Sequence, residues 1–229
     1  MKLKIIGVGS FTQNDLSQFT EPPQWRKATR NMIIATASVQ CALREPQPQW
    51  LTEASERVAL IVGTNSGELD TTTEFLATFV KMGMARPVLF QNSLHNATAG
   101  FTSIQLKVRG PSFTLSSGSN TAAECVTLAE NLMADGIVDI CIVICVEGHQ
   151  RVAEMLGFGL GLNDESLRDG ACALVLATTD ACVRWGLSDA PDLDRAQACQ
   201  AYPPPQIAPF YQIEKLGMFR LVQSLEAIK

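Results

Sequence analysis

The sequence predicts an α/β fold in which helices cover both faces of a sheet. Continuous runs of apolar residues, typical of strands buried on both faces, alternate along the chain with segments of helical spacing. Hydrophobic residues make up 46% of the sequence and charged residues 18%, which suits a well-packed core. With 229 residues, the chain is long enough for one large domain or two small ones.

Five apolar segments are expected to form the strands of this sheet. Each is short and bounded by glycine, proline or polar residues, as strands are. In chain order they are LKIIGVG from Leu3, RVALIVG from Arg57, SFTLS from Ser112, VDICIVICVEG from Val138 and ACALVLATT from Ala171.

Four segments between these strands have helical spacing, namely 26–45, 71–82, 97–108 and 121–135. The last of them is apolar over more than one stripe, so we expect other elements or a second subunit to bury most of it. The residues between the second and third helices are expected to form a loop. The stretch GTNSGE from Gly63 lacks the GK[ST] ending of a phosphate loop and is interpreted as a strand-to-helix turn.

The composition of the chain changes towards its C-terminus. From Ala190 the sequence becomes rich in proline, alanine and glutamine, and a last amphipathic helix is expected over 212–228. We therefore expect two parts, a main domain over 1–185 and an irregular Pro-rich segment with a C-terminal helix over 186–229. Whether the second part packs on the domain or on a partner is left open.

Charge and composition argue against several classes of function. The net charge is −5 and the chain has no block of basic residues, so nucleic-acid binding is not expected. No run of about 18 apolar residues predicts a membrane span. The seven cysteines form no CxxC pair and several lie in apolar runs, which predicts buried, reduced thiols that act as small apolar groups in a cytoplasmic protein. With two histidines a zinc site is not expected, and no cofactor is predicted.

Ser119 is the candidate for chemistry. It lies in the turn of GPSFTLSSGSNTAAECVTLAENLMADG, residues 110–136, which reads as a strand, a tight turn and a helix. Such a junction presents one side chain to the start of a helix dipole, but a serine there also needs a base, for which His95 and His149 are the candidates. The simpler interpretation is a turn residue whose hydroxyl helps to satisfy backbone groups at the helix start.

Four motifs carry a resemblance to a known family. They are HNATAG at 95–100, RGPSFTLSSGSNTAAE at 109–124, LAENLMADGIVDICIVICVEG at 128–148 and DGACALVLAT at 169–178. These segments resemble the N-terminal half of β-ketoacyl-acyl-carrier-protein synthases. The resemblance implies a thiolase-like fold, N-terminal half only, with a mixed five-stranded sheet and helices on both faces. Within the superfamily the sequence is similar to the short, chain-length-factor-like subunits that accompany ketosynthases in bacterial aryl polyene pathways.

The departures from the family bear on catalysis. Aligning Gly110–Ser112 with the family's GPS turn puts Ser119 at the position of the active cysteine. The family also uses two histidines from its C-terminal half, one of them in an HGTGT motif, and neither pattern occurs here. The resemblance therefore implies a chain with no condensing activity and no catalytic residue of its own.

The resemblance also implies a partner. In ketosynthases the strand that matches SFTLS pairs with its counterpart across the dimer, which makes Phe113 and Leu115 candidate partner-facing residues. Phe75, Leu89 and Phe90 match a helix and loop that line or close the partner's acyl tunnel, and a core role is the equal alternative.

We therefore expect a silent subunit that forms a heterodimer with an active ketosynthase, stabilises it and shapes its acyl tunnel in aryl polyene, polyketide or fatty-acid-type biosynthesis. The acyl carrier protein is expected to dock mainly on the active partner, because the acidity of this chain repels an acidic carrier. One alternative is a Ser119-dependent acyltransferase acting on carrier-protein thioesters. The other is a homodimeric scaffold without a ketosynthase partner.

Overall fold

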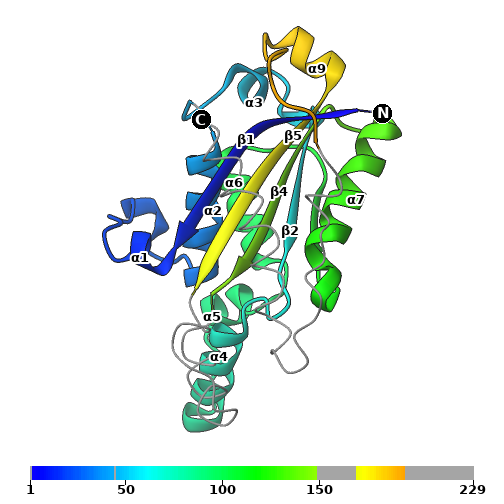
Figure 1. Cartoon of the computed structure of the whole chain (residues 1–229). Helices are drawn as coiled ribbons and strands as arrows, with labels where there is room; N and C mark the ends of the chain where they lie inside the picture. The colour runs from blue at the N-terminus through cyan, green and yellow to red at the C-terminus, as the bar shows by residue number, and fades with distance from the viewer. Residues whose placement is uncertain (1, 44, 149–168, 194–229) are drawn as a thin grey trace.

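The computed structural model describes residues 2–43, 45–148 and 169–193, which form one mixed five-stranded sheet with helices on both faces (Figure 1). The strands are β1 (Leu3–Thr12), β2 (Val58–Gly63), β3 (Ser112–Leu115), β4 (Ile140–Glu147) and β5 (Gly170–Thr178). Their order in the sheet is β1-β5-β4-β2-β3. Strand β2 pairs in parallel with β3 and β4, whereas β5 pairs antiparallel with β1 and β4. The predicted fold class is confirmed.

All five expected strands are present. Every residue of β2 and β4 is buried, as their continuous apolar sequences predict. Strand β1 is longer than expected and continues to Thr12, because Phe11 and Thr12 pair with Ala171 and Gly170 of β5. The partner strand therefore extends β1 beyond the apolar run that is visible in the sequence.

Helices form a layer on each face of the sheet, and two more helices project beyond one end of it (Figure 1). The helices are α1 (Gln13–Leu16), α2 (Arg30–Ala42), α3 (Gln49–Glu53), α4 (Leu69–Met82), α5 (Pro87–Asn92), α6 (Ala97–Leu106), α7 (Thr121–Ala134) and α9 (Thr179–Arg184). Helices α2 and α6 cover one face of the sheet and α7 covers the other, while α4 and α5 extend beyond one end of it (Figure 1). The four expected helices correspond to α2, α4, α6 and α7.

One expectation about the loops is wrong. The stretch between α4 and α6 was expected to be a loop, but it contains the helix α5 (Pro87–Asn92). Pro87 occupies the first turn of this helix, where its fixed φ is favourable and its missing N–H is not needed. The backbone N–H of Ser93 donates to the carbonyl oxygen of Leu89 at 2.9 Å and ends the helix.

Helix α2 packs unusually close to β1. A Cβ atom at Gly7 would collide with the Ala42 carbonyl oxygen, and one at Gly9 with the Ala42 backbone nitrogen. Glycine at these two positions therefore lets the helix backbone lie directly on the strand. The helix starts at Thr29, whose hydroxyl accepts a hydrogen bond from the N–H of Met32 at 3.2 Å.

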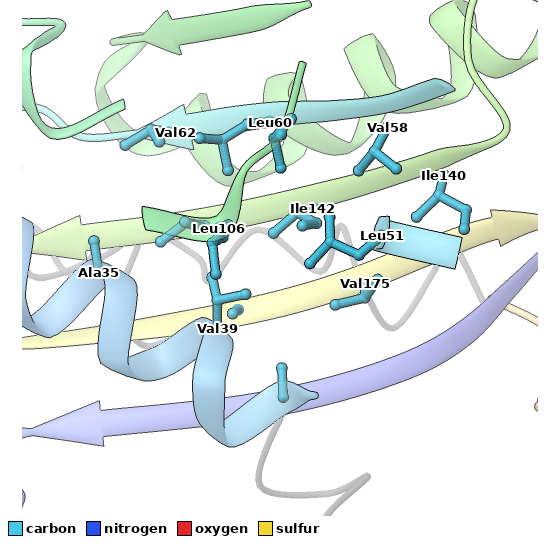
Figure 2. Close-up of a cluster of buried hydrophobic side chains, with 14 of the residues drawn as sticks. Ala35, Val39, Leu51, Val58, Leu60, Val62, Leu106, Ile140, Ile142 and Val175 are labelled. Atoms are coloured by element: carbon cyan, nitrogen blue, oxygen red, sulfur yellow. The ribbon is translucent and has the colours of Figure 1, made fainter. Parts of the chain in front are cut away.

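Two buried clusters make up the core, one on each face of the sheet. The cluster under α2 and α6 includes Ala35, Val39, Leu60, Leu106, Ile142 and Val175 (Figure 2). The cluster under α7 includes Val126, Ala129, Ile61, Val143, Leu174 and four of the cysteines, Cys125, Cys141, Cys145 and Cys172. These thiols are buried as small apolar groups, as the sequence predicted.

The described part of the C-terminal segment returns along β1. The N–H of Ile5 donates to the carbonyl oxygen of Pro191 at 2.9 Å, and the N–H of Leu193 donates to that of Leu3 at 2.8 Å. The Nζ atom of Lys4 lies 2.8 Å from Oδ1 of Asp192. The expected helix at 212–228 lies outside the described residues.

Candidate functional site

The turn that carries Ser119 lies between the end of β3 and the start of α7. Here the 3-10 turn η3 (Gly118–Asn120) leads directly into the helix, and we call it the elbow. Gly118 has a φ of 58°, in the left-handed region that favours glycine. The structure therefore places Ser119 at a strand–turn–helix junction, as the sequence predicts.

A buried hydroxyl ties the elbow to the turn after β2. Thr121, the first residue of α7, is 1% exposed. Its Oγ1 accepts a hydrogen bond from the N–H of Ser117 at 2.6 Å and donates to Oδ1 of Asn65 at 3.1 Å. The elbow is thus held by contacts within the chain on the side that faces β2.

The end of β4 supplies a carboxylate to the same turn. Glu147 is 3% exposed and accepts hydrogen bonds from the backbone N–H groups of Asn65 and Ser66, the second at 3.4 Å. Successive backbone N–H groups of this kind form an anion-binding concavity, and here a side chain of the same chain fills it. This contact gives Glu147 a structural role at the turn.

Asp139 has a different environment at the other end of β4. Its Oδ1 lies 2.7 Å from Nη2 of Arg57 and its Oδ2 lies 3.0 Å from Nη1 of Arg184. The hydrogen bond from Arg57 lowers the pKa of the Asp139 carboxyl below its ordinary value. Because Asp139 precedes the strand and Glu147 ends it, the two carboxylates do not form a general-acid pair.

Of the two candidate bases, His95 lies against the turn after β2. A Cβ atom at Gly67 would collide with Nδ1 of the His95 imidazole, and the φ of 55° at Gly67 also favours glycine. His149 lies outside the described residues. The structure therefore places one imidazole at this turn, and a contact between a histidine and Ser119 stays a prediction.

Glu68 is a buried acid that the sequence analysis did not single out. It is 5% exposed, and its carboxyl accepts hydrogen bonds from the hydroxyls of Thr29, Thr71 and Thr98. Burial raises the pKa of Glu68, and the bonds from the hydroxyls oppose that effect. An acid at the end of GTNSGE was visible in the sequence, but its partners Thr29 and Thr98 are distant along the chain.

The predicted tunnel residues Phe75, Leu89 and Phe90 lie on α4 and α5. The ring centroids of Phe75 and Phe90 are 5.6 Å apart, so the two helices meet through their aromatic side chains. Leu89 is half-buried and Phe90 is 54% exposed. None of these three residues belongs to the buried clusters of the sheet, so they are not core residues of the sheet domain.

Together, α4 and α5 form an arm with an exposed apolar surface. We call residues 69–92 the α4–α5 arm. Neither helix buries a residue. The large exposed apolar side chains of the arm are Leu69, Leu76, Phe79, Val80, Met82, Met84, Val88 and Phe90. Folded proteins rarely expose so many large apolar side chains within one short segment, so the arm is a candidate contact site.

The predicted partner-facing residues Phe113 and Leu115 lie on β3. Among the described strands β3 pairs with β2 alone, so it forms an edge of the sheet. Leu115 packs against the cluster under α7, and Phe113, two residues away, shares that face and is 36% exposed. The expected edge strand is therefore present, with one aromatic side chain partly open to solvent.

Within the part of the chain that the structure describes, no group of three or more His, Cys, Asp and Glu side chains could hold a metal ion. No helix in the same residues is both long and apolar enough to span a bilayer.

Comparison with known proteins identifies the family. A family model described as "Beta-ketoacyl synthase, N-terminal domain" matches residues 34–198, which is more than half of the chain. The chain belongs to this β-ketoacyl synthase family. The match includes the elbow, the arm and strands β2 to β5, so the described site lies within the family's domain.

One curated relative and two solved structures illustrate the relationship. The 3-oxoacyl-[acyl-carrier-protein] synthase 2 of Rhizobium meliloti (strain 1021) is 27% identical over 139 residues, which cover 58% of this chain and 32% of the relative. The ishigamide ketosynthase/chain length factor superposes with a TM-score of 0.66 at 14% identity, over 79% of this chain and 63% of that one. A β-ketoacyl synthase from Burkholderia phymatum STM815 superposes with a TM-score of 0.64 at 15% identity, over 81% and 61%.

These similarities show the fold of the domain and its extent. The superpositions confirm the thiolase-like ketosynthase fold that the sequence motifs predicted. The chain spans about a third of the length of the curated relative and less than two thirds of the two solved chains. The activity and partners of those whole proteins therefore enter only as proposals.

Proposed function

We propose that this ketosynthase-like domain is a catalytically silent, chain-length-factor-like subunit. It forms a heterodimer with an active β-ketoacyl-ACP synthase, stabilises that enzyme and shapes its acyl tunnel in aryl polyene, polyketide or fatty-acid-type biosynthesis. The observation that carries the proposal is the position of Ser119, a hydroxyl residue at the elbow where the family has its active cysteine.

The chemistry of the elbow supports a silent subunit. A cysteine at a helix start is activated because the dipole favours its thiolate, whereas a serine hydroxyl needs a neighbouring base. The carboxylate that the structure places at the adjoining turn, Glu147, is already engaged by the N–H groups of Asn65 and Ser66. This arrangement favours a braced turn over an activated nucleophile.

Two surface features support a partner. The edge of β3 presents backbone groups that another strand can pair with, and the α4–α5 arm exposes apolar side chains. One of the similar solved structures is described as a ketosynthase/chain length factor. A ketosynthase partner that contacts β3 and the arm accounts for both features.

The heterodimer is tested by co-expression with an active ketosynthase of the same organism, followed by size-exclusion chromatography and mass measurement. We expect co-elution, and an increase of the dissociation constant of at least about tenfold in Phe113→Lys and Val80→Lys, because each places a charge in an apolar contact. Val183→Lys is the matched control, since Val183 is 67% exposed on α9, away from both features. A chain that binds only itself contradicts the proposal.

Silence is tested separately with the purified chain and an acyl-carrier thioester. Intact-mass measurement is expected to show no acyl adduct on the chain, and product analysis no condensation. An adduct that disappears in Ser119→Ala supports the serine-dependent acyltransferase instead. Condensation by the chain alone overturns the proposal.

The effect on the tunnel is tested with the reconstituted heterodimer. Phe90→Ala removes a ring that is 54% exposed on the arm, so we expect the distribution of product chain lengths to shift towards longer chains. Val183→Ala is the control and is expected to leave that distribution unchanged. An unchanged distribution in Phe90→Ala, Phe75→Ala and Leu89→Ala would separate these residues from the tunnel.

A further inference from the structure

The α4–α5 arm needs an anchor other than apolar burial. Helix α4 has 14 residues and α5 has 6, and neither buries a single one. Figure 1 shows the two helices extending beyond the end of the sheet. Because apolar burial normally fixes the direction of a helix, the arm must be held mainly at its base.

The base of the arm contains one carboxyl group that contacts three helices. Glu68 is the residue immediately before α4, and its Oε1 accepts hydrogen bonds from the hydroxyls of Thr29 at 2.8 Å and Thr98 at 2.5 Å. Its Oε2 accepts one from Thr71 at 3.2 Å. Thr29 caps α2, Thr71 lies in α4 and Thr98 lies in α6. The carboxyl therefore joins the first turns of three helices.

These hydroxyls are the groups that compensate the burial of Glu68. None of the ion pairs formed by the described residues includes Glu68, and its charged neighbour Asp70 raises its pKa further. Threonine hydroxyls can donate to a carboxylate or accept from a protonated carboxyl, so the cluster is satisfied in either state. A buried acid that lost these bonds would carry the full cost of desolvation.

Two further contacts direct the arm towards the start of α2. The side-chain amide of Asn31 donates to the carbonyl oxygen of Gly67, next to Glu68. The side-chain amide of Asn92, at the end of α5, donates to the carbonyl oxygen of Lys27 at 2.9 Å. Both ends of the arm are thus tied by polar contacts to residues around the beginning of one core helix.

We propose that Glu68 is a positioning residue whose hydrogen bonds to Thr29, Thr71 and Thr98 fix the direction of the α4–α5 arm. The arm is thereby presented to a partner as a preformed apolar surface, and only this second statement rests on the proposed function. A preformed surface loses less conformational entropy on binding than a loose one, so the contacts of Glu68 act on affinity from a distance.

The experiment measures amide hydrogen exchange of the α4–α5 arm in the full chain. Thr98→Val removes one hydroxyl from Glu68 while keeping the shape of the side chain, and Thr98→Ser keeps the hydroxyl. Thr102→Val is the matched control: Thr102 lies one turn further along α6, is 0% exposed, and its hydroxyl contacts that of Thr36 at 3.0 Å instead.

We expect Thr98→Val to speed exchange in the arm by at least about tenfold, because a hydrogen bond to a buried acid is lost. Thr98→Ser and Thr102→Val are expected to stay close to the wild type in the arm. Glu68→Leu is expected to act like Thr98→Val, and Glu68→Gln, which keeps an acceptor oxygen, to restore most of the protection. Equal exchange in Thr98→Val and Thr102→Val overturns the positioning role.

The same variants separate this proposal from the proposed function. With a ketosynthase that binds the wild type, Glu68→Leu is expected to raise the dissociation constant at least about tenfold and Glu68→Gln to restore it. If no ketosynthase binds the wild type while the arm still depends on Glu68, the positioning role stands and the proposed function fails. If binding occurs and Glu68→Leu leaves both exchange and affinity unchanged, the positioning role fails alone.

Discussion

The sheet and the α4–α5 arm use apolar side chains in opposite ways. All residues of β2 and β4 are buried, with one cluster on each face of the sheet. The arm is also rich in apolar residues, yet none of its helical residues is buried, and Val80 is 82% exposed. Packing within the described part of the chain therefore does not account for the apolar residues of the arm, which makes the arm a candidate contact surface.

The largest expected effect is the loss of stability when an apolar side chain of the sheet, rather than one of the arm, is shortened to alanine. Ile142 is 0% exposed in β4, so Ile142→Ala should lower the free energy of unfolding by about 2–5 kcal/mol through lost burial and a cavity. Val80→Ala on the arm should change it by about 0.5 kcal/mol or less. Urea unfolding of both variants checks this comparison. Similar losses at the two sites would mean that the arm is part of the core.

The contact of α7 with the sheet can be broken by one methyl group. A Cβ atom at Gly63 would lie 2.7 Å from Cγ2 of Thr121 and 2.9 Å from Sγ of Cys125. Gly63→Ala should therefore displace the start of α7 and destabilise the fold by about 1–3 kcal/mol.

The matched control for that change is Gly100→Ala. Gly100 lies inside α6 with nothing within 4 Å of the added atom, so alanine there should stabilise the protein by about 0.5–1 kcal/mol. Thermal unfolding of both variants is the measurement. Equal shifts of the melting temperature in the same direction would contradict the close packing of Gly63 against Thr121 and Cys125 of α7.

A smaller effect concerns the pH dependence of stability at the base of the arm. Burial raises the pKa of Glu68 above its ordinary value of 4.5, so the folded state holds the proton more tightly than the unfolded state. The stability that this proton adds to the folded state is fully present below pH 4.5. It is lost as the pH rises through the raised pKa of Glu68.

Glu68→Gln should therefore remove a decline in stability with rising pH that the wild type shows above about pH 4.5. Glu74→Gln, on the exposed side of α4, is the control and should keep the decline. Urea unfolding in steps of pH gives the slopes. Parallel curves for the wild type and Glu68→Gln would show that the carboxyl titrates as in the unfolded chain.

The smallest effect concerns the chemical reactivity of two cysteines, which reports whether solvent reaches their thiols in the native protein. Burial raises the pKa of Cys141 to about 12, whereas Cys41 is exposed. Iodoacetamide at about pH 8 should modify Cys41 in the native protein and leave Cys141 unmodified, because the thiolate is the reactive form. Peptide mass mapping identifies the site, and Cys41→Ser is the control. Modification of Cys141 at a comparable rate would show that the α7 face of the sheet opens to solvent.

The sheet could be predicted from the sequence because its strands are buried on both faces. Such strands appear as uninterrupted apolar runs, and β2 and β4 are the clearest examples. The turn that carries Ser119 was visible in its Ser, Gly and Asn residues, whereas the edge position of β3 followed from the resemblance to the family.

The missed features depend on contacts that are distant in sequence. Glu68 is joined to Thr29 across 39 positions and to Thr98 across 30, and no local pattern reveals such a pairing. Helix α5 was missed because its apolar residues are too few for a recognisable period, although Pro87 marks its first turn. For Phe90 the sequence left a partner-facing role and a core role equally open, and its 54% exposure in the structure argues against the core role.

The shortness of β3 limits what pairing along it can achieve. Four residues span about 13 Å, so any strand laid beside β3 can exchange only a few backbone hydrogen bonds with it. Pairing of that length fixes the relative direction and the register of the two strands, but it contributes little to the binding free energy. The strength of an association through this side of the molecule must come from side chains, and aromatic residues such as Phe113 supply the most contact area for each residue involved.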